Sequence, residues 1–387
     1  MTGAPFNNLQ HPGQAATAAL RRQDFPAAKA LFSQATQARP QDTAAWFGLA
    51  LACLHLGDDL GHASAVERVL AAQPNHVPAL ILQGDRFDRS GDDRAAEAFY
   101  RAALSRAPPL ESLPPDLRQE LGRAQRQCDR YARAFEAHLL DAIAQAGFDP
   151  ATSSARFAQS LDLLLGKRQL YVQQPTSYYF PELPQRQFYE RAEFPWLAAI
   201  EAQTAAIRAE LLGVVGDDEA FQPYVRGSDL RPQIEFGDLR DNPDWSAFYL
   251  IEGGVLKAEA ASRCPRTLEA LSHAPLCAVP GRTPSVLFSL LRPGTRIPPH
   301  TGQINARLIC HLPLIVPAGC GLRVGNEVRP WVEGEALIFD DTFEHEAWND
   351  SNELRVVLLF EIWRPDLTPE ERDLVTVTLA SVASYRA

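Results

Sequence analysis

Two histidines, His300 and His345, stand next to strand-like runs in the C-terminal third of the chain. They lie in the segments IPPHTGQINARLICHLP and FDDTFEHEAWN. Imidazole nitrogens are suitable ligands for Fe(II), although the usual three-ligand site adds a carboxylate. The residue two places after His300, where an H-x-D site carries that carboxylate, is Gly302. The spacing therefore leaves two interpretations open: a metal site that lacks one ligand, or two unrelated histidines of a β-domain.

Three further polar residues occur inside neighbouring apolar runs: Ser289 in SVLFSLL, His311 in ARLICHLPLIV and Arg355 in LRVVLLFEIW. Because side chains alternate across a strand, Arg307, Ile309 and His311 are expected on one face. A buried arginine or histidine among aliphatic residues is costly unless an anion or a metal accompanies it, and a guanidinium pairs bidentately with a carboxylate. The pattern predicts a small-ligand cavity of the kind in which a non-haem Fe(II) site holds a 2-oxo acid.

The elements that must position these residues follow a period of two from residue 283 onward. The expected strands are SVLFSLL, ARLICHLPLIV, GLRVGN, ALIFDD and LRVVLLFEIW, separated by turns that contain Gly, Pro, Asn and Asp. This rhythm is typical of an antiparallel sandwich or barrel. His300 is expected in a turn between two strands. One amphipathic helix over 194–215 is expected to open this domain.

The first hundred residues repeat at an interval of 34. The repeated positions are Pro40, Pro74 and Pro108, and Asp24, Asp58 and Asp92. Each repeat reads as a helix, a short turn, a second helix and a closing proline, which resembles the tetratricopeptide repeat. Stacked repeats leave a concave groove, which would either dock a peptide or protein or belong to a spacer or dimerisation platform. Residues 109–170 are expected to form a capping helix and a connector, so the domains are placed at 1–165 and 166–387.

The composition excludes several classes of partner. The 387 residues carry a net charge of −11, which argues against a nucleic-acid or anionic-membrane surface. No run approaches the ~18 apolar residues of a membrane span, and the first residues lack the pattern of a signal peptide. The six cysteines show no C-x-x-C spacing. A reducing cytoplasm is the expected compartment.

Three blocks carry a resemblance to a known family: RPGTRIPPHTGQINARLICHLPLIVP, WVEGEALIFDDTFEHEAWNDS and LRVVLLFEIWRPDLTPEER. They resemble the aspartyl/asparaginyl β-hydroxylase family of Fe(II)- and 2-oxoglutarate-dependent dioxygenases, over roughly 175–375. The resemblance implies a double-stranded β-helix (jelly-roll, cupin-like) domain. Members of this family commonly carry tetratricopeptide-like repeats ahead of it, which agrees with the 34-residue period.

The resemblance also assigns roles at the metal. His300 and His345 would be the iron ligands, and glycine at the position of Gly302 is a family trait, so that water completes the coordination. Asp341, four residues before His345, would orient an iron-bound water. The alternative for Asp341 is turn chemistry at the end of a strand.

By the same resemblance, Ser289 and Arg355 would hold the distal carboxylate of 2-oxoglutarate and His311 would contact its 1-carboxylate end. Arg307 matches a family arginine near the substrate side and is grouped with these residues. Two positions depart from the better-known animal members. Ile309 stands where they have an arginine, and Leu287 where they have a lysine.

These observations predict an α+β protein in which a helical repeat domain precedes a double-stranded β-helix. The expected activity is Fe(II)- and 2-oxoglutarate-dependent hydroxylation, at the β-carbon of Asp or Asn in a peptide or protein or in an Asp-like small molecule. The alternative is a non-catalytic interaction protein, in which the repeats bind a partner and the β-domain is degenerate.

Overall fold

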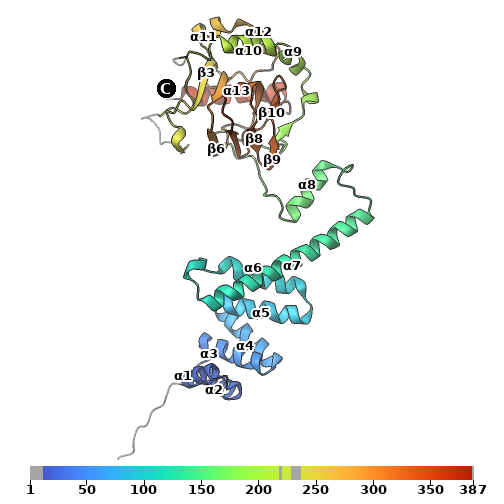
Figure 1. Ribbon diagram of the computed structural model, residues 1–387, viewed down its shortest axis with the longest axis vertical. Helices are drawn as coiled ribbons and strands as arrows, with labels where there is room; N and C mark the ends of the chain where they lie inside the picture. The colour runs from blue at the N-terminus through green and yellow to red at the C-terminus, as the bar shows by residue number, and fades with distance from the viewer. Residues whose placement is uncertain (1–11, 218–219, 228–236, 386–387) are drawn as a thin grey trace, which may run out of the picture. The chain divides into compact units, whose positions relative to one another are not determined.

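A computed structural model describes residues 12–217, 220–227 and 237–385. The chain divides into two compact units, Met1–Leu165 and Gly166–Ala387. The first is helical and the second is built around β-sheets (Figure 1). Residues 1–11, on which the expectation about a signal peptide rests, lie outside the described residues. Among the helices of the described ranges, none has the length and apolar character needed to cross a membrane.

Helical hairpins build the first unit. The pairs are α1 (Pro12–Arg21) with α2 (Phe25–Ala38), α3 (Thr43–His55) with α4 (Asp59–Ala72), and α5 (Val77–Ser90) with α6 (Asp93–Arg106). The 34-residue period has a direct cause, because Asp24, Asp58 and Asp92 each cap the second helix of a pair. Their carboxylates accept backbone N–H groups three residues on, at 3.2, 3.0 and 3.0 Å. The predicted tetratricopeptide-like repeats are confirmed.

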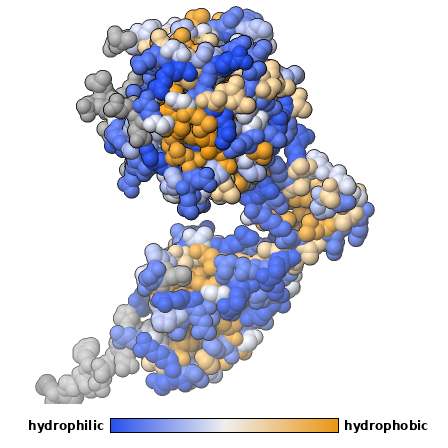
Figure 2. All heavy atoms as spheres, turned by 45° about the horizontal axis from the view of Figure 1, so that its top comes forward, coloured by the Kyte–Doolittle hydropathy of each residue, from blue (hydrophilic) through white to orange (hydrophobic). Residues whose placement is uncertain are grey.

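The first unit ends in two helices, α7 (Pro115–Gln145) and α8 (Ala155–Leu164), with a proline at the start of α7 as expected. The first half of α7 packs on the repeats through buried side chains that include Leu121 and Tyr131. Its second half and α8 expose apolar residues, among them Phe135 and Leu164. Apolar side chains are visible on the surface of this region in Figure 2.

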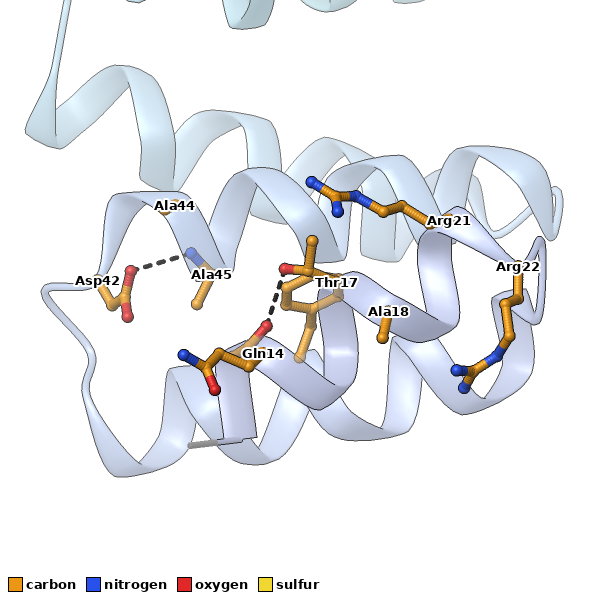
Figure 3. A pocket seen from close by; sticks show the side chains of 10 residues that line it. Gln14, Thr17, Ala18, Arg21, Arg22, Asp42, Ala44 and Ala45 are labelled. Atoms are coloured by element: carbon orange, nitrogen blue, oxygen red, sulfur yellow. Dashed lines mark hydrogen bonds between the residues drawn. The ribbon is translucent and has the colours of Figure 1, made fainter. Parts of the chain in front are cut away.

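A pocket of about 670 Å³ lies between α1 and the start of α3, the first helices of two successive repeats. Figure 3 shows Thr17 and Arg21 of α1, with Arg22 just after the helix, on one side and the N-cap of α3, Asp42, on the other. Both polar and apolar atoms line it. This is the kind of hollow that stacked repeats are expected to leave.

Two antiparallel sheets form the second unit. Their strands are β1 (Phe188–Tyr189), β2 (Gln222–Pro223), β3 (Trp245–Glu252), β4 (Val255–Leu256), β5 (Val286–Leu291), β6 (Arg296–His300), β7 (Arg307–Ile315), β8 (Cys320–Val324), β9 (Glu327–Arg329), β10 (Leu337–Phe339), β11 (His345–Asn349) and β12 (Arg355–Trp363). The large sheet has the order β1-β10-β7-β12-β5-β3-β2, with β4 on β3, and the small sheet has the order β6-β11-β8-β9. All five expected runs are strands, and the predicted fold class is confirmed.

The two faces of the large sheet bury different residues. One face packs against α9 (Leu197–Glu201), α10 (Thr204–Leu212), α11 (Ala258–Arg263) and α12 (Pro265–Leu271), which lie together in Figure 1. Leu308, Cys310 and Leu312 of β7 belong to this core. Ile309 and Val357 point to the opposite face, where they pack with residues of the small sheet. The alternation expected along β7 and β12 is therefore confirmed, and the predicted polar residues face the space between the sheets.

Three local expectations were wrong or incomplete. The single helix expected over 194–215 is two helices, α9 and α10, and at the break between them the Thr204 hydroxyl donates to the Glu201 carbonyl at 2.6 Å. His300 is the last residue of strand β6 and does not lie in a turn. The C-terminal helix α13 (Pro369–Ser384) was not expected.

Candidate active site

The two histidines meet across the small sheet. His300 ends β6 and His345 begins β11, and the two residues are paired directly in the antiparallel register. Their ring centroids are 4.1 Å apart. The pairing of two strands thus brings together side chains that are separated by 45 positions in the sequence.

Both imidazole rings are oriented in the same way. The Nδ1 atom of His300 lies 2.8 Å from the Pro298 carbonyl, and that of His345 lies 3.1 Å from the Phe343 carbonyl. A backbone carbonyl only accepts, so each Nδ1 carries the proton and each Nε2 carries the lone pair. Burial lowers the pKa of both rings, and for His345 the neighbouring His300 lowers it further. The pair is therefore neutral near pH 7, which is the metal-binding form of imidazole.

The space beside Gly302, where an H-x-D site would have its carboxylate, is occupied by the side chain of Asp341. A Cβ atom on Gly302 would lie 2.1 Å from Oδ2 of Asp341, so no other residue fits at 302 without displacing that carboxylate. The Gly302 N–H also donates to the Asp341 carbonyl at 2.7 Å. Within the described ranges no group of three or more His, Cys, Asp or Glu is arranged to hold a metal. These residues offer a metal two histidines, with a carboxylate beside them.

Asp341 is held by Arg307. The Arg307 guanidinium lies 3.0 Å from Asp341 and 2.8 Å from Glu361, and all three side chains are buried. The two carboxylates raise the pKa of Arg307 despite its burial. Arg307 was grouped with the co-substrate residues, but the structure engages it with two acids of the protein. Its position favours a role in holding Asp341.

Arg355 is the most unusual charged residue of the unit. Its side chain is 1% exposed, and among the described residues no carboxylate pairs with it. One guanidinium nitrogen donates to the Ser289 carbonyl at 3.4 Å, and the guanidinium carbon lies 4.8 Å from the centre of the Trp331 ring. Nε has no hydrogen-bond partner in the described part of the chain. Burial lowers the pKa of Arg355 to about 10.

Ser289 and His311 flank this arginine on the adjacent strands. Ser289 pairs with Val357 and His311 pairs with Leu359, both on the strand that begins with Arg355. The Ser289 hydroxyl accepts from the Trp245 indole at 3.4 Å. His311 is buried, and its Nδ1 finds no hydrogen-bond partner among the described residues. Burial and the charge of Arg355 lower the pKa of His311 to about 3, so this ring is neutral.

Three aromatic rings connect the predicted residues, and the sequence analysis missed all of them. Trp245 lies 6.3 Å from His300 and reaches Ser289. Phe339 lies 5.8 Å from His345 and 4.9 Å from His311. Trp331 lies 6.0 Å from His311 and covers Arg355. His300, His345, Ser289, His311 and Arg355 therefore line one aromatic-walled region between the sheets.

The site that these residues define contains two neutral histidines and a buried arginine within a double-stranded β-helix, and no acid of the described ranges pairs with that arginine. Residues 201–365 match the profile of the family described as Aspartyl/Asparaginyl beta-hydroxylase, and residues 14–76 match the Tetratricopeptide repeat. The chain thus carries a domain of the aspartyl/asparaginyl beta-hydroxylase family together with tetratricopeptide repeats.

Individual proteins are similar to parts of this chain. The "Aspartyl/asparaginyl beta-hydroxylase" of Mus musculus is 42% identical over 139 residues, which are 35% of this chain and 18% of that protein. The "Ornithine lipid ester-linked acyl 2-hydroxylase" of Rhizobium tropici is 37% identical over 184 residues, which are 47% of this chain and 62% of that protein. A Cupin 2 conserved barrel domain protein from Salinispora arenicola CNS-205 aligns with a TM-score of 0.22 at 12% identity, over 40% of this chain and 98% of that one. The chain therefore spans less than two thirds of each of the two curated relatives.

Proposed function

We propose that the second unit is an Fe(II)- and 2-oxoglutarate-dependent hydroxylase. The observation that carries this proposal is Arg355, a buried cation for which the described chain supplies no anion. An arginine in that state is costly unless a ligand brings the missing charge. A dicarboxylate such as 2-oxoglutarate would bring it in bidentate geometry. Membership in the hydroxylase family supports the same activity.

The donor set fits Fe(II). His300 and His345 would hold the metal through their Nε2 atoms, since their Nδ1 atoms are engaged with backbone carbonyls. Asp341 supports the fit, because its Oδ1 is buried without a hydrogen-bond partner among the described residues. A water on the metal would satisfy that oxygen. Bound Fe(II), together with 2-oxoglutarate and O2, would supply the oxidising power to hydroxylate an unactivated C–H bond.

The protein's own residues would bind and orient the co-substrate. Arg355 and the Ser289 hydroxyl would hold its distal carboxylate, and neutral His311 would contact its other end. The rings of Trp331 and Phe339 would keep water away from this region, which strengthens the pairing between guanidinium and carboxylate. Arg307 would act indirectly, because it would hold the Asp341 carboxylate beside the metal.

For the substrate, we propose the β-carbon of an Asp or Asn residue in a peptide or protein, or of an Asp-like small molecule. The repeats would dock a protein partner, for which the pocket between α1 and α3 offers a surface. Ile309 and Leu287, both buried, stand at the positions where the animal members carry cations. Both side chains are apolar, so an acidic group of the substrate would have to be bound elsewhere in the site. We also place the protein in the cytoplasm, which its six unpaired cysteines favour.

Anaerobic titration with Fe(II) and 2-oxoglutarate tests the proposal. We expect a weak visible metal-to-ligand band that disappears in a His345→Ala variant. Absence of iron binding, together with absence of succinate formation with any candidate substrate, would refute the enzyme. That result would favour the alternative, a non-catalytic interaction protein.

A second experiment identifies the substrate class. Cell extract is incubated with enzyme, Fe(II) and 2-oxoglutarate, and products heavier by about 16 Da, one added oxygen atom, are sought by mass spectrometry in separate peptide, metabolite and lipid fractions. A product in the peptide or metabolite fraction is expected. A product confined to the lipid fraction would contradict the substrate part of the proposal and leave the hydroxylase part intact.

A further inference from the structure

The two histidine-bearing segments are joined by a third segment, which lies ahead of the residues matched by the family profile. This segment, residues 173–180, is called the strap below. It runs beside 302–305 and 340–342 without forming a regular strand. Because one of these stretches follows His300 and the other precedes His345, the strap contacts the flanks of both proposed metal ligands.

Backbone hydrogen bonds make a continuous ladder across the three segments. The Gln174 N–H donates to the Thr342 carbonyl at 2.7 Å, and the Thr176 N–H donates to the Gly302 carbonyl at 3.0 Å. The Gly302 N–H in turn donates to the Asp341 carbonyl at 2.7 Å. The strap therefore fixes the Gly302 turn and the Asp341–Thr342 turn relative to each other, at the place where the proposed metal, its ligands and Asp341 must be in register.

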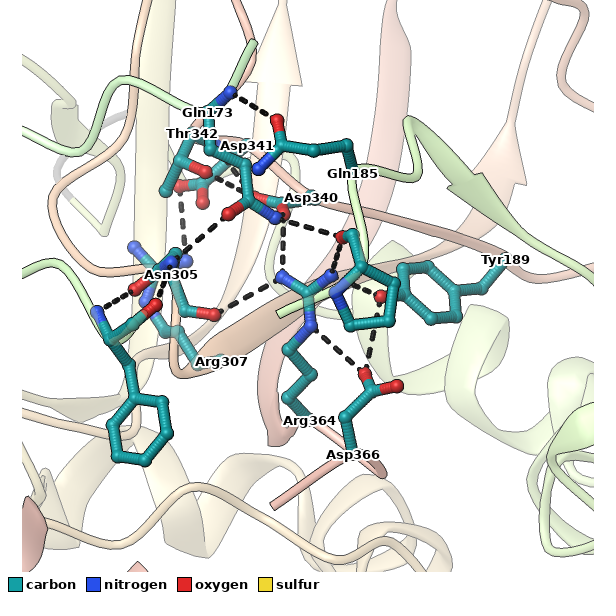
Figure 4. A network of polar contacts seen from close by, with 12 residues as sticks. Gln173, Gln185, Tyr189, Asn305, Arg307, Asp340, Asp341, Thr342, Arg364 and Asp366 are labelled. Atoms are coloured by element: carbon teal, nitrogen blue, oxygen red, sulfur yellow. Dashed lines mark hydrogen bonds and ion pairs between the residues drawn. The ribbon is translucent and has the colours of Figure 1, made fainter. Parts of the chain in front are cut away.

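One side chain of the strap ties this ladder to the interior. Gln173 is 6% exposed, and its amide donates to the Asp340 carboxylate at 2.7 Å and accepts from the Asn305 amide at 3.0 Å. Asp340 also pairs with Arg364 at 2.7 Å and accepts the Thr342 N–H at 3.0 Å. Figure 4 shows the Gln173 side chain reaching between Asn305 and Asp340.

The network controls the direction of the neighbouring carboxylate. Asp340 and Asp341 are adjacent in the chain, but Asp340 pairs with Arg364 while Asp341 pairs with Arg307. Fixing the side chain of Asp340 therefore fixes the backbone from which Asp341 reaches the metal side. Asn305 also holds the other end of the strap. Its side-chain oxygen accepts the Phe180 N–H at 2.6 Å, and its amide donates to the Phe180 carbonyl at 2.9 Å.

We propose that the strap is a positioning element of the metal site and that Gln173 is the residue through which it acts. The proposal rests on the metal site proposed above. It does not make Gln173 a catalytic residue, because Gln173 contacts neither histidine. Loss of a residue that hydrogen-bonds to a metal ligand commonly weakens metal binding by about 10- to 100-fold. We expect a similar effect for Gln173, which acts through Asp340.

The test uses the full chain with Gln173→Met, which keeps the length of the side chain and removes its hydrogen bonds. The matched control is Gln187→Met, the same substitution nearby in the same unit, where the lost hydrogen bond is the one from the Asn326 N–H at 3.2 Å. Both proteins are titrated anaerobically with Fe(II), and with Co(II) as a spectroscopic probe, at a temperature at which circular dichroism shows them to be folded.

We expect the Kd for the metal to rise about 10-fold in Gln173→Met, with a changed Co(II) absorption spectrum, and to stay within about twofold of wild type in Gln187→Met. A Kd within about twofold of wild type in Gln173→Met would overturn the proposal. So would equal weakening in the control. If the wild-type protein itself binds no metal, the proposed function fails, which is a distinguishable result.

A second variant covers the case in which Gln173→Met does not fold. Thr176→Pro lies at an exposed position and removes both donors to the Gly302 carbonyl, the Thr176 N–H at 3.0 Å and its hydroxyl at 3.3 Å. Because the two donors share one acceptor, we expect the Kd for Fe(II) to rise about threefold to tenfold, the range that corresponds to one net hydrogen bond. An unchanged Kd in a folded Thr176→Pro protein would overturn the positioning role of the strap.

Discussion

Among the residues that the structure describes, the two largest fully buried side chains are Arg355, at the start of strand β12, and Arg364, directly after its end. Arg364, directly after the strand, pairs with Asp340 at 2.7 Å and with Asp366 at 3.0 Å. It also donates to the carbonyls of Asn305 and Pro184. Arg355, at the start of the strand, has one distant carbonyl and the face of an indole ring. Both arginines are buried. Acids and carbonyls of the described residues surround the guanidinium of Arg364, but that of Arg355 has far fewer acceptors there.

This difference separates a cation that the protein itself satisfies from the one that we propose binds a ligand. A buried charge is tolerated when acceptors surround it, and Arg364 meets that condition within the chain. Its neighbours raise the pKa of Arg364, while burial without an acid lowers that of Arg355. Arg364 is therefore satisfied within the chain without any ligand, whereas Arg355, for which the described residues supply no acid, is the cation that we propose a ligand carboxylate stabilises.

Arg364→Met should give the largest change in stability. It leaves the buried Asp340 carboxylate without its cation, which typically costs about 3–5 kcal/mol of unfolding free energy. Urea unfolding followed by tryptophan fluorescence measures this, because five of the six tryptophans lie in the second unit. A loss below about 1 kcal/mol would contradict the structural role of Arg364.

Arg355→Met is the matched substitution and should give the opposite pattern. Removing a buried cation that lacks an acid should leave the unfolding free energy of the ligand-free protein unchanged or raised. The affinity for 2-oxoglutarate should fall by at least about 30-fold, since truncating one partner of a buried charge pair costs about 2 kcal/mol or more. Calorimetric titration of the metal-loaded protein measures the affinity. Unchanged binding would show that Arg355 does not hold the co-substrate.

A third prediction uses pH to test the surroundings of Arg355. Burial and Arg355 lower the pKa of His311 to about 3 from its ordinary value of 6.5. The unfolded chain therefore takes up this proton first, so the contribution of neutral His311 is complete above pH 6.5 and is lost as the pH falls toward 3. Between pH 6.5 and pH 5 the unfolding free energy should therefore fall by about 2 kcal/mol because of His311, at 1.36 kcal/mol for each pH unit.

The variant His311→Gln isolates this contribution. Its unfolding free energy should fall less steeply with acid than that of the wild type, by about the same 2 kcal/mol at pH 5. His273→Gln, a change of an exposed histidine in the same unit, should retain the wild-type slope. Identical slopes for wild type and His311→Gln would be inconsistent with a buried neutral His311.

Tyr189→Phe should give the smallest effect of the series. The Tyr189 hydroxyl is one of several acceptors for Arg364, and the two acids and two carbonyls remain when it is removed. We expect a loss of about 1 kcal/mol, the net value of one hydrogen bond, in the same urea measurement. The exposed Tyr179, changed to Phe, should show none. A loss as large as that of Arg364→Met would mean that the network around Arg364 is not redundant.

Most elements of the fold were predictable from the period of the sequence pattern. The spacing of Asp24, Asp58 and Asp92 predicted the helical hairpins because each aspartate caps a helix, and capping is a local interaction. The period of two along β7 and β12 predicted which side chains face the space between the sheets. The break between α9 and α10 was missed, since the apolar pattern continues across it without a helix-breaking residue.

The site was predictable only where family motifs marked it. His300, His345, Ser289, His311 and Arg355 lie together, but spacing alone left the two histidines ambiguous. The roles of Trp245, Trp331 and Glu361 depend on which strands are neighbours, and strand order is a long-range property that no local pattern encodes. The second acid of Arg307 was missed for the same reason, because Glu361 meets it across the β7–β12 pairing.

The steric relation between Gly302 and Asp341 has a consequence for substitutions at these two positions. Because a Cβ atom at 302 would meet the Asp341 carboxylate, a second acid at 302 would require that carboxylate to move away from its present place. Homologues that carry an acid at 302 should therefore tend to carry a smaller residue at 341, and an engineered Gly302→Asp change should be tolerated better alongside Asp341→Gly than alone.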